Sequence, residues 1–72
     1  IDIEAYEDSG LTNADIFYTI KYKFIFDQLI WEFGDENQPD WIHVSYNELD
    51  NRKQVLKAIK ENGKTKYIKY DN

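Results

Sequence analysis

Residues 28–46, QLIWEFGDENQPDWIHVSY, hold two apolar segments on either side of a polar one. Residues 27–33 crowd four large apolar side chains together and are typical of a buried strand. Residues 41–46 alternate between two faces with the period of two that indicates a strand. The residues between them, 34–39, are rich in turn formers. The pattern therefore predicts two strands, with the only histidine of the chain, His43, in the middle of the second.

Two further elements are predicted before this segment. Residues 1–5 alternate between apolar and acidic side chains, which predicts a strand. Thr12 or Asn13 can cap a helix, and Asp15 suits the positive end of the helix dipole. Apolar residues then recur at helical spacing, so we expect a helix at about residues 13–23.

The C-terminal part, residues 55–69, fits two structures. Apolar residues at positions 55, 56 and 59 fit a short amphipathic helix. Alternation on both sides of Asn62-Gly63 fits a hairpin, which we favour because this dipeptide suits a type I′ turn with positive φ at both central positions. The order strand, helix, strand, strand, hairpin predicts an α+β fold in which the helix packs on a mainly antiparallel sheet with a C-terminal β-hairpin.

Length and composition limit what the chain can be. Its 72 residues allow one domain at most, and 42% hydrophobic with 17% aromatic residues favours a packed core over disorder. A net charge of −5 works against nucleic acid or an anionic membrane as a partner, and no apolar run approaches the ~20 residues of a membrane span. The chain also lacks cysteine, so no disulfide can stabilise it. Because the sequence opens inside an apolar and acidic pattern, we expect it to be a fragment of a longer protein.

His43 has two interpretations. It is either a sheet histidine that hydrogen-bonds a neighbour or a zinc ligand, because neutral imidazole is a good zinc donor and a strand fixes its direction. A catalytic zinc takes three protein ligands, so carboxylates would have to supply what one histidine cannot. Asp2 is a solvated surface residue unless the first strand lies beside His43, in which case it is a second ligand.

Two carboxylates compete for the role of general base. Asp40 lies three residues before His43, where it either shapes the turn after Pro39 or takes a proton from a zinc-bound water. Glu32 is the single carboxylate of an apolar strand, where burial would raise its pKa toward the range useful for acid–base chemistry. Its alternative is a solvent-facing position.

Four side chains are expected to shape a substrate groove, although packing in the core or at an edge is the alternative for the aromatic ones. They are Trp31, Trp41, Ser45 and Tyr46. The lysine-rich C-terminal part is most simply a solvated hairpin, whose charges discourage edge-to-edge aggregation.

The segment FDQLIWEFGDENQPDWIHVSY, followed by NRKQVLKAIKENGKTKYI, resembles the C-terminal half of zinc D-Ala-D-Ala carboxypeptidases. More closely, it is similar to the phage-endolysin branch of that family, which shares its fold with the hedgehog N-terminal domain. The resemblance covers residues 1–70 and is most specific over residues 27–46. It implies that residues 1–72 are the C-terminal part of a hedgehog/DD-peptidase-like domain.

Two zinc-binding motifs of that family bear on this chain. Trp41-Ile42-His43-Val44-Ser45 matches the second motif, Trp-x-His-Val-Ser, whose histidine is a ligand. Asp2 matches the final ligand of the first motif, Ser-x-His-x-x-Gly-x-Ala-x-Asp, whose own histidine would lie seven residues earlier, before Ile1. Many relatives have a glutamate base three residues before the second histidine, and this chain has Asp40 there.

The resemblance implies a bacterial or phage zinc metallopeptidase that cleaves peptidoglycan stem peptides in the bacterial cell wall. The 72-residue chain would bind zinc weakly or not at all and would have no peptidase activity, because one ligand lies outside it. The alternative is a binding or structural module that keeps the fold without catalysis.

Overall fold

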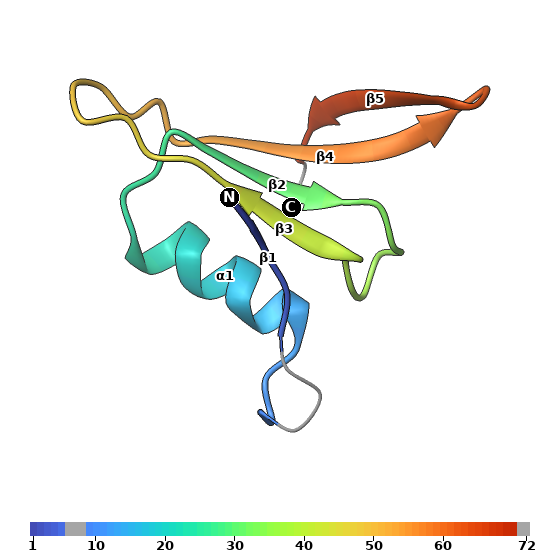
Figure 1. The fold of residues 1–72 in the computed structure, drawn as a ribbon, viewed down its shortest axis with the longest axis horizontal. Coiled ribbons are helices and arrows are strands. Elements are labelled where there is room, and N and C mark those ends of the chain that lie inside the picture. Colours follow the sequence, from blue (N-terminus) through green and yellow to red (C-terminus); the bar gives the residue numbers. More distant parts are fainter. Residues whose placement is uncertain (6–8, 71–72) are drawn as a thin grey trace.

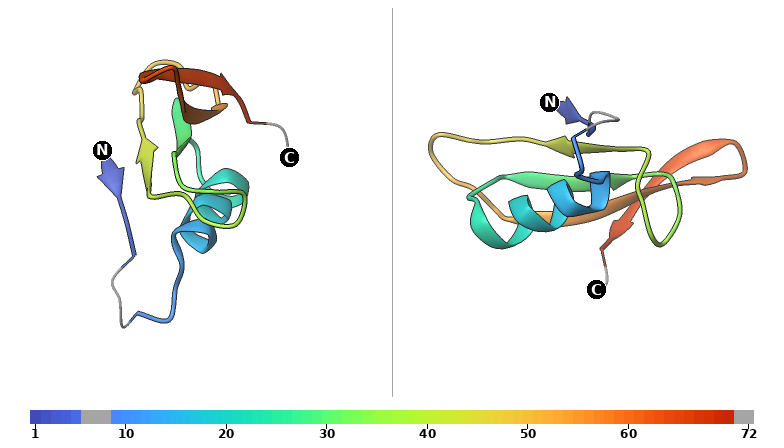
Figure 2. Two further views of the ribbon diagram at one scale, coloured as in Figure 1. Left: turned by 90° about the vertical axis from the view of Figure 1, so that its right-hand side faces the viewer. Right: turned by 90° about the horizontal axis from the view of Figure 1, so that it is seen from below.

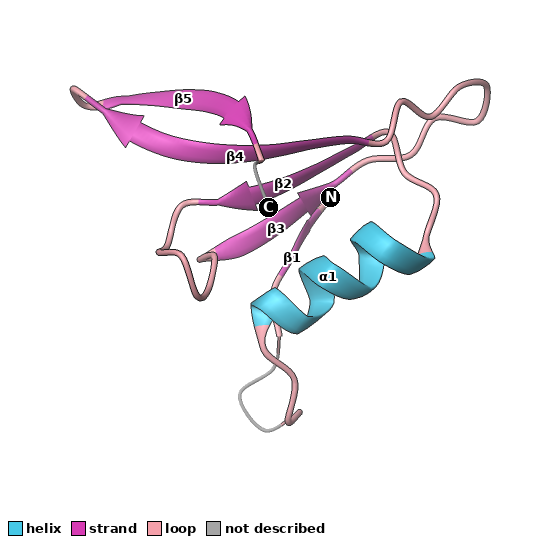
Figure 3. Ribbon diagram, turned by 180° about the vertical axis from the view of Figure 1, so that it is seen from behind, coloured by secondary structure: helices cyan, strands magenta, loops and turns pink. Residues whose placement is uncertain are grey.

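The computed structural model describes residues 1–5 and 9–70, in which one helix packs against a five-stranded sheet (Figure 1). The elements are β1 (Asp2–Ile3), α1 (Asn13–Lys23), β2 (Gln28–Glu32), β3 (Trp41–Val44), β4 (Gln54–Glu61) and β5 (Lys64–Lys69). The strand order in the sheet is β1-β3-β2-β4-β5, and α1 lies against the β2 and β3 part of one face (Figure 3). The predicted α+β class is confirmed.

The sheet is mixed, whereas the sequence predicted a mainly antiparallel one. Strands β2 and β4 run parallel, while the other neighbouring pairs are antiparallel. The reason is that the antiparallel strand β3 ends beside the beginning of β2. The chain then crosses that edge of the sheet and starts β4 on the other side of β2, so β4 runs in the same direction as β2. The backbone N–H of Gln54 donates to the carbonyl oxygen of Asp27 at 2.9 Å, which fixes the start of β4 beside the start of β2.

Helix α1 has the predicted bounds because its first turn carries a complete capping box. The Thr12 hydroxyl accepts from the backbone N–H of Asp15, and the Asp15 carboxylate accepts from the backbone N–H of Thr12, both at 3.0 Å. Lys21 and Lys23 in the last turn suit the negative end of the dipole. With 11 residues, α1 is shorter than a bilayer span requires, and the described residues contain no other helix.

The core lies between α1 and one face of the sheet. Its five largest fully buried side chains are Phe17, Phe26, Leu29, Trp31 and Ile42. The rings of Phe17 and Trp31 meet edge to face, with centroids 5.0 Å apart, which joins the helix to β2. Because side chains alternate along a strand, this arrangement leaves the residues between them on the opposite face of the sheet.

The C-terminal hairpin is confirmed, and the alternative of a helix over residues 55–59 is wrong. Asn62 and Gly63 between β4 and β5 have φ values of 53° and 77°, the left-handed values that a tight hairpin turn requires. All residues of β5 are exposed, and the tip of the hairpin extends beyond the area that α1 covers (Figure 2).

The other strands are shorter than predicted. The strand expected at residues 1–5 is limited to Asp2–Ile3, and the backbone N–H of Ala5 already donates to the side chain of Asn13 at 2.6 Å. The strand expected at residues 27–33 stops at Glu32 because Phe33 takes a positive φ of 58°. Residues 6–8, between β1 and α1, lie outside the described residues.

Candidate metal centre

Three neighbouring strands bring Asp2, Glu32 and His43 together. Asp2 on β1 lies directly opposite His43 on β3, and His43 lies directly opposite Ile30 on β2. Glu32 is two residues further along β2, so its side chain points to the same face. This is the face turned away from α1, because Leu29, Trp31 and Ile42, the alternating neighbours, form the core with the helix.

The donor atoms of these three residues converge. The Asp2 Oδ1 and His43 Nδ1 atoms are 3.0 Å apart, although the residues are separated by 41 positions in the sequence. One donor atom from each of Asp2, Glu32 and His43 lies within 4.8 Å of the other two. The first strand therefore lies beside His43, and the side chains of Asp2 and His43 point into one small volume. We call these three residues the acidic triad.

Burial and charge both act on Glu32. The residue is 9% exposed, and its burial is the main reason why the pKa of its carboxyl is raised above the ordinary value of 4.5. The negative charge of Asp2 raises this pKa further, and His43 acts in the opposite direction. Two carboxylates beside one imidazole therefore make a site where a bound cation would relieve charge repulsion.

The contact between Asp2 and His43 also satisfies the simpler interpretation of His43. With a proton on Nδ1, the imidazole donates a hydrogen bond to the Asp2 carboxylate. With the proton on Nε2, the Nδ1 lone pair is available to a metal ion. The His43 side chain is 33% exposed and that of Asp2 is 64% exposed, so solvent reaches both groups.

Asp40 lies apart from the acidic triad. It is exposed just before β3, and its carboxylate is not among the converging donor atoms. Its backbone N–H donates to the carbonyl oxygen of Glu32 at 2.9 Å, and its carbonyl oxygen accepts from the Asn13 side chain at 3.0 Å. Of the two carboxylates considered for the general base, Glu32 is therefore the one placed beside Asp2 and His43.

The side chains expected to shape a groove are dispersed. Trp31 is 1% exposed on the helix side of the sheet, where its indole N–H donates to the carbonyl oxygen of Asp35 at 3.1 Å. The Ser45 hydroxyl accepts from the backbone N–H of Gln28 at 3.1 Å, and Tyr46 is exposed beyond the end of β3. Trp41 lies directly opposite Glu32 on β2, in a shallow hollow that Asp2 also lines.

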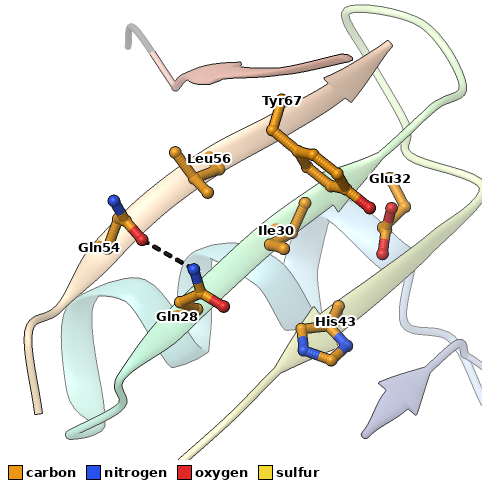
Figure 4. A pocket seen from close by; sticks show the side chains of 7 residues that line it. All are labelled: Gln28, Ile30, Glu32, His43, Gln54, Leu56 and Tyr67. Carbon is orange, nitrogen blue, oxygen red and sulfur yellow. Dashed lines mark hydrogen bonds between the residues drawn. The ribbon is translucent and has the colours of Figure 1, made fainter. Parts of the chain in front are cut away.

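A different groove lies beside the acidic triad, and the sequence did not predict it. It has a volume of about 540 Å³ and is lined by Gln28, Ile30, Glu32, His43, Gln54, Leu56 and Tyr67 (Figure 4). The period of two along β2 could have assigned its first three residues to one face. The contribution of β4 and β5 could not be found in this way, because nothing local specifies that β4 pairs with β2.

The donor set fits a divalent cation. Imidazole nitrogen and carboxylate oxygen are both ligands of zinc, and together they also suit other first-row divalent metals. Zinc bonds are about 2.0–2.2 Å long, so donor atoms around one zinc ion lie closer together than 4.8 Å, the distance within which the donor atoms of the acidic triad lie. Binding would therefore need small side-chain rotations, which the exposure of Asp2 permits.

Comparison of the chain with protein-family models, with curated proteins and with solved structures found no match.

Proposed function

We propose that this chain carries part of the centre of a zinc-dependent peptidase that cleaves the stem peptides of peptidoglycan. The observation that carries the proposal is the convergence of Asp2, Glu32 and His43 from three strands beside an open groove. The match of His43 and Asp2 to the zinc ligands of the carboxypeptidase and endolysin family supports the choice of metal and of substrate.

The three residues have separate roles in this proposal. Asp2 and His43 would hold the metal ion, and His43 would bind it as a neutral imidazole. Bound zinc would polarise the scissile carbonyl group and lower the pKa of a water molecule. Glu32 takes the proton of the attacking water and passes it to the leaving amine. Its burial supports this role, because a raised pKa brings a carboxyl group closer to the pH at which proton transfer in both directions is efficient.

A third ligand is needed for a catalytic zinc site. In the family that the sequence resembles, this ligand is a histidine seven residues before the aspartate, a position that precedes Ile1. Under the proposal, peptidase activity belongs to a longer chain, and the 72 residues bind zinc weakly.

A zinc titration of the 72-residue chain, followed by NMR, tests the metal site. We expect millimolar zinc to shift the imidazole signals of His43 and the backbone signals of Asp2, and His43→Ala or Asp2→Asn to abolish the response. Asp40→Asn is the matched control, because it removes a nearby carboxylate that lies outside the acidic triad. Zinc shifts that survive both ligand substitutions would contradict the assignment.

Activity is tested in a chain extended toward its N-terminus to include the expected histidine. This longer chain should release products from peptidoglycan stem peptides, and Glu32→Gln should lower turnover by roughly 10²-fold or more while zinc content is retained. Unchanged turnover in Glu32→Gln would exclude Glu32 as the base.

A non-catalytic module is the second candidate function. The observation that favours it is the 3.0 Å contact between Asp2 and His43, which satisfies both side chains without a metal ion. In that case zinc would leave the His43 signals unchanged, and the extended chain would bind cell-wall peptides without cleaving them.

A further inference from the structure

The groove beside the acidic triad runs along β2, with polar side chains at both ends and an apolar floor between them. Glu32 lies at one end, the side chains of Gln28 and Gln54 lie at the other, and His43 lies beside Ile30 between the two ends (Figure 4). Four strand residues separate Glu32 from Gln28, which corresponds to roughly 13 Å at about 3.3 Å per residue. An extended ligand held at one end would therefore reach the other after about four residues.

The two glutamines form an amide pair with free hydrogen-bonding capacity. Gln28 and Gln54 lie directly opposite each other on the parallel strands β2 and β4, and Gln28 Nε2 donates to Gln54 Oε1 at 2.8 Å. This bond leaves the carbonyl oxygen of Gln28 and the amide N–H groups of Gln54 without another partner among the described residues. If the oxygen and nitrogen atoms of both side-chain amides are exchanged, the pair still presents one free carbonyl oxygen and one free amide NH₂ group. A peptide group, with one carbonyl oxygen and one N–H, is complementary to this pair.

The floor at the middle of the groove is apolar. This floor is formed by Ile30, which is 6% exposed, and by Leu56, and the ring of Tyr67 forms one wall with its hydroxyl end toward Glu32 (Figure 4). A charged ligand side chain placed on this floor would lose water to apolar atoms, which is costly. The floor therefore favours an uncharged ligand side chain between Glu32 and the amide pair.

We propose that the groove is the binding site of an extended, uncharged peptide segment, and that the Gln28–Gln54 pair holds one of its backbone amide groups. This inference deepens the proposed function, because it identifies what part of a substrate lies on one side of the scissile bond. The binding itself requires no metal ion, so it can be measured independently of zinc.

The test is an NMR titration of the isotope-labelled 72-residue chain with acetyl-tetra-alanine amide in the presence of EDTA. We expect selective shifts of the side-chain amide signals of Gln28 and Gln54. Gln54→Leu should weaken binding about 5- to 10-fold, the effect of losing one neutral hydrogen bond. The backbone spectrum of the variant shows whether the fold is kept.

A charge substitution provides a second readout that a merely structural role would not change. In Gln54→Glu, Gln28 can still donate to the new side chain, but the groove gains a negative charge. This variant should prefer acetyl-Ala-Ala-Lys-Ala-amide over the alanine peptide by about 10-fold, whereas the unsubstituted chain should prefer the alanine peptide. Thr19→Glu is the matched control, because it adds the same charge on the exposed side of α1 and should keep the original preference.

The outcomes separate this inference from the proposed function. If the charge substitution reverses the preference but zinc leaves His43 unaffected, the peptide groove is supported and the peptidase proposal fails. If zinc shifts His43 but the peptide shifts neither glutamine, or Gln54→Glu keeps the original preference, the groove assignment is overturned. Peptide-induced shifts confined to residues outside the groove would also overturn it.

Discussion

The Glu32 side chain is buried, although its carboxyl group would be ionised in water at neutral pH. Its pKa is raised, first by burial and then by the charge of Asp2. The ionised form is thus less stable in the folded chain than in the unfolded chain. Below the ordinary pKa of 4.5 the carboxyl is protonated in both states, and burial of Glu32 does not lower the free energy of unfolding through its charge. This free energy decreases as the pH rises through the folded-state pKa. At neutral pH the metal-free protein therefore carries a destabilising carboxylate, which a functional site can tolerate.

Replacing this charge should stabilise the metal-free fold. We expect Glu32→Gln to increase the free energy of unfolding at pH 7 by about 1 kcal/mol, within the usual range of single substitutions, and to leave it unchanged below pH 4.5. Urea denaturation at both pH values measures the difference. Glu36→Gln in the exposed loop is the control and should change stability little. Destabilisation by Glu32→Gln at pH 7 would mean that the carboxylate has a stabilising partner in solution.

Asp27 shows the opposite electrostatic situation. Its carboxylate accepts hydrogen bonds from Arg52 Nε at 2.8 Å and from Arg52 Nη2 at 3.0 Å, and these bonds hold its pKa below the ordinary value of 3.8. A depressed pKa stabilises the fold above 3.8, and this contribution is lost as the pH falls through the folded-state value.

Asp27→Asn should therefore make the free energy of unfolding less dependent on pH in the acidic range. We expect a lower free energy of unfolding at pH 7 and a smaller decrease below pH 3.8, measured by thermal unfolding across this range. Asp40→Asn serves as the control, because none of the described hydrogen bonds involves its carboxylate. An equally steep loss of stability in Asp27→Asn and in the unsubstituted chain would refute the role of the pair.

At the scale of elements, the turn between β2 and β3 sets the distance between Glu32 and His43. Its second residue is Gly34, which has a φ of 71°. A Cβ atom at this position would lie 2.1 Å from the carbonyl oxygen of Gln38 and 2.8 Å from the Cα of Pro39. Both neighbours are backbone atoms, so they cannot move aside as a flexible side chain would.

Gly34→Ala should thus destabilise the chain more than an ordinary glycine substitution. We expect a loss of about 2–3 kcal/mol in unfolding free energy, from the positive φ and the backbone clash together. Gly10→Ala is the matched control, since its φ of 76° is similar but nothing lies within 4 Å of the added Cβ atom, and it should lose only about 1 kcal/mol. Equal losses in the two variants, measured by urea denaturation, would show that the clash is relieved without cost.

At the scale of the whole molecule, the end of the chain is attached to the core through Tyr70. Its ring lies 5.0 Å from that of Phe17 and 5.8 Å from that of Trp31, measured between centroids. Its hydroxyl group is 3.0 Å from that of Tyr18 on α1. Burial, followed by this hydrogen bond, raises the pKa of Tyr70 to about 12. The contact connects the exposed hairpin to the helix on the other side of the core.

The contact between the hydroxyl groups of Tyr70 and Tyr18 should stabilise the fold less at alkaline pH. Because the pKa of Tyr70 is higher in the folded chain than the ordinary value of 10.0, its contribution is complete below pH 10 and decreases as the pH rises toward 12. We expect Tyr70→Phe to remove this part of the alkaline loss, and to cost about 1 kcal/mol at pH 7 through the lost hydrogen bond. Thermal unfolding between pH 7 and 11 measures both effects. Tyr46→Phe, at an exposed position, is the control, and the same alkaline loss in Tyr70→Phe would contradict the assignment.

Features that depend on residues close together in the chain could be predicted from the amino-acid sequence. The capping box of Thr12 and Asp15 specified the start of α1, and Asn62-Gly63 specified the hairpin, because capping and turn geometry need only a few consecutive residues. The apolar neighbours of Glu32 were enough to raise burial and a perturbed pKa as one of its two alternatives.

Which elements lie side by side depends on contacts between residues far apart in the chain, and these could not be predicted from the sequence. Asp2 and His43 are 41 residues apart, and their contact depends on β1 pairing with the outer side of β3. The parallel pairing of β2 with β4 placed Gln54 opposite Gln28, and the position of α1 decided that Trp31 faces the core and not the groove. Strand alternation defines two faces but does not state which one is covered, since that choice depends on how distant segments bury their apolar surface together.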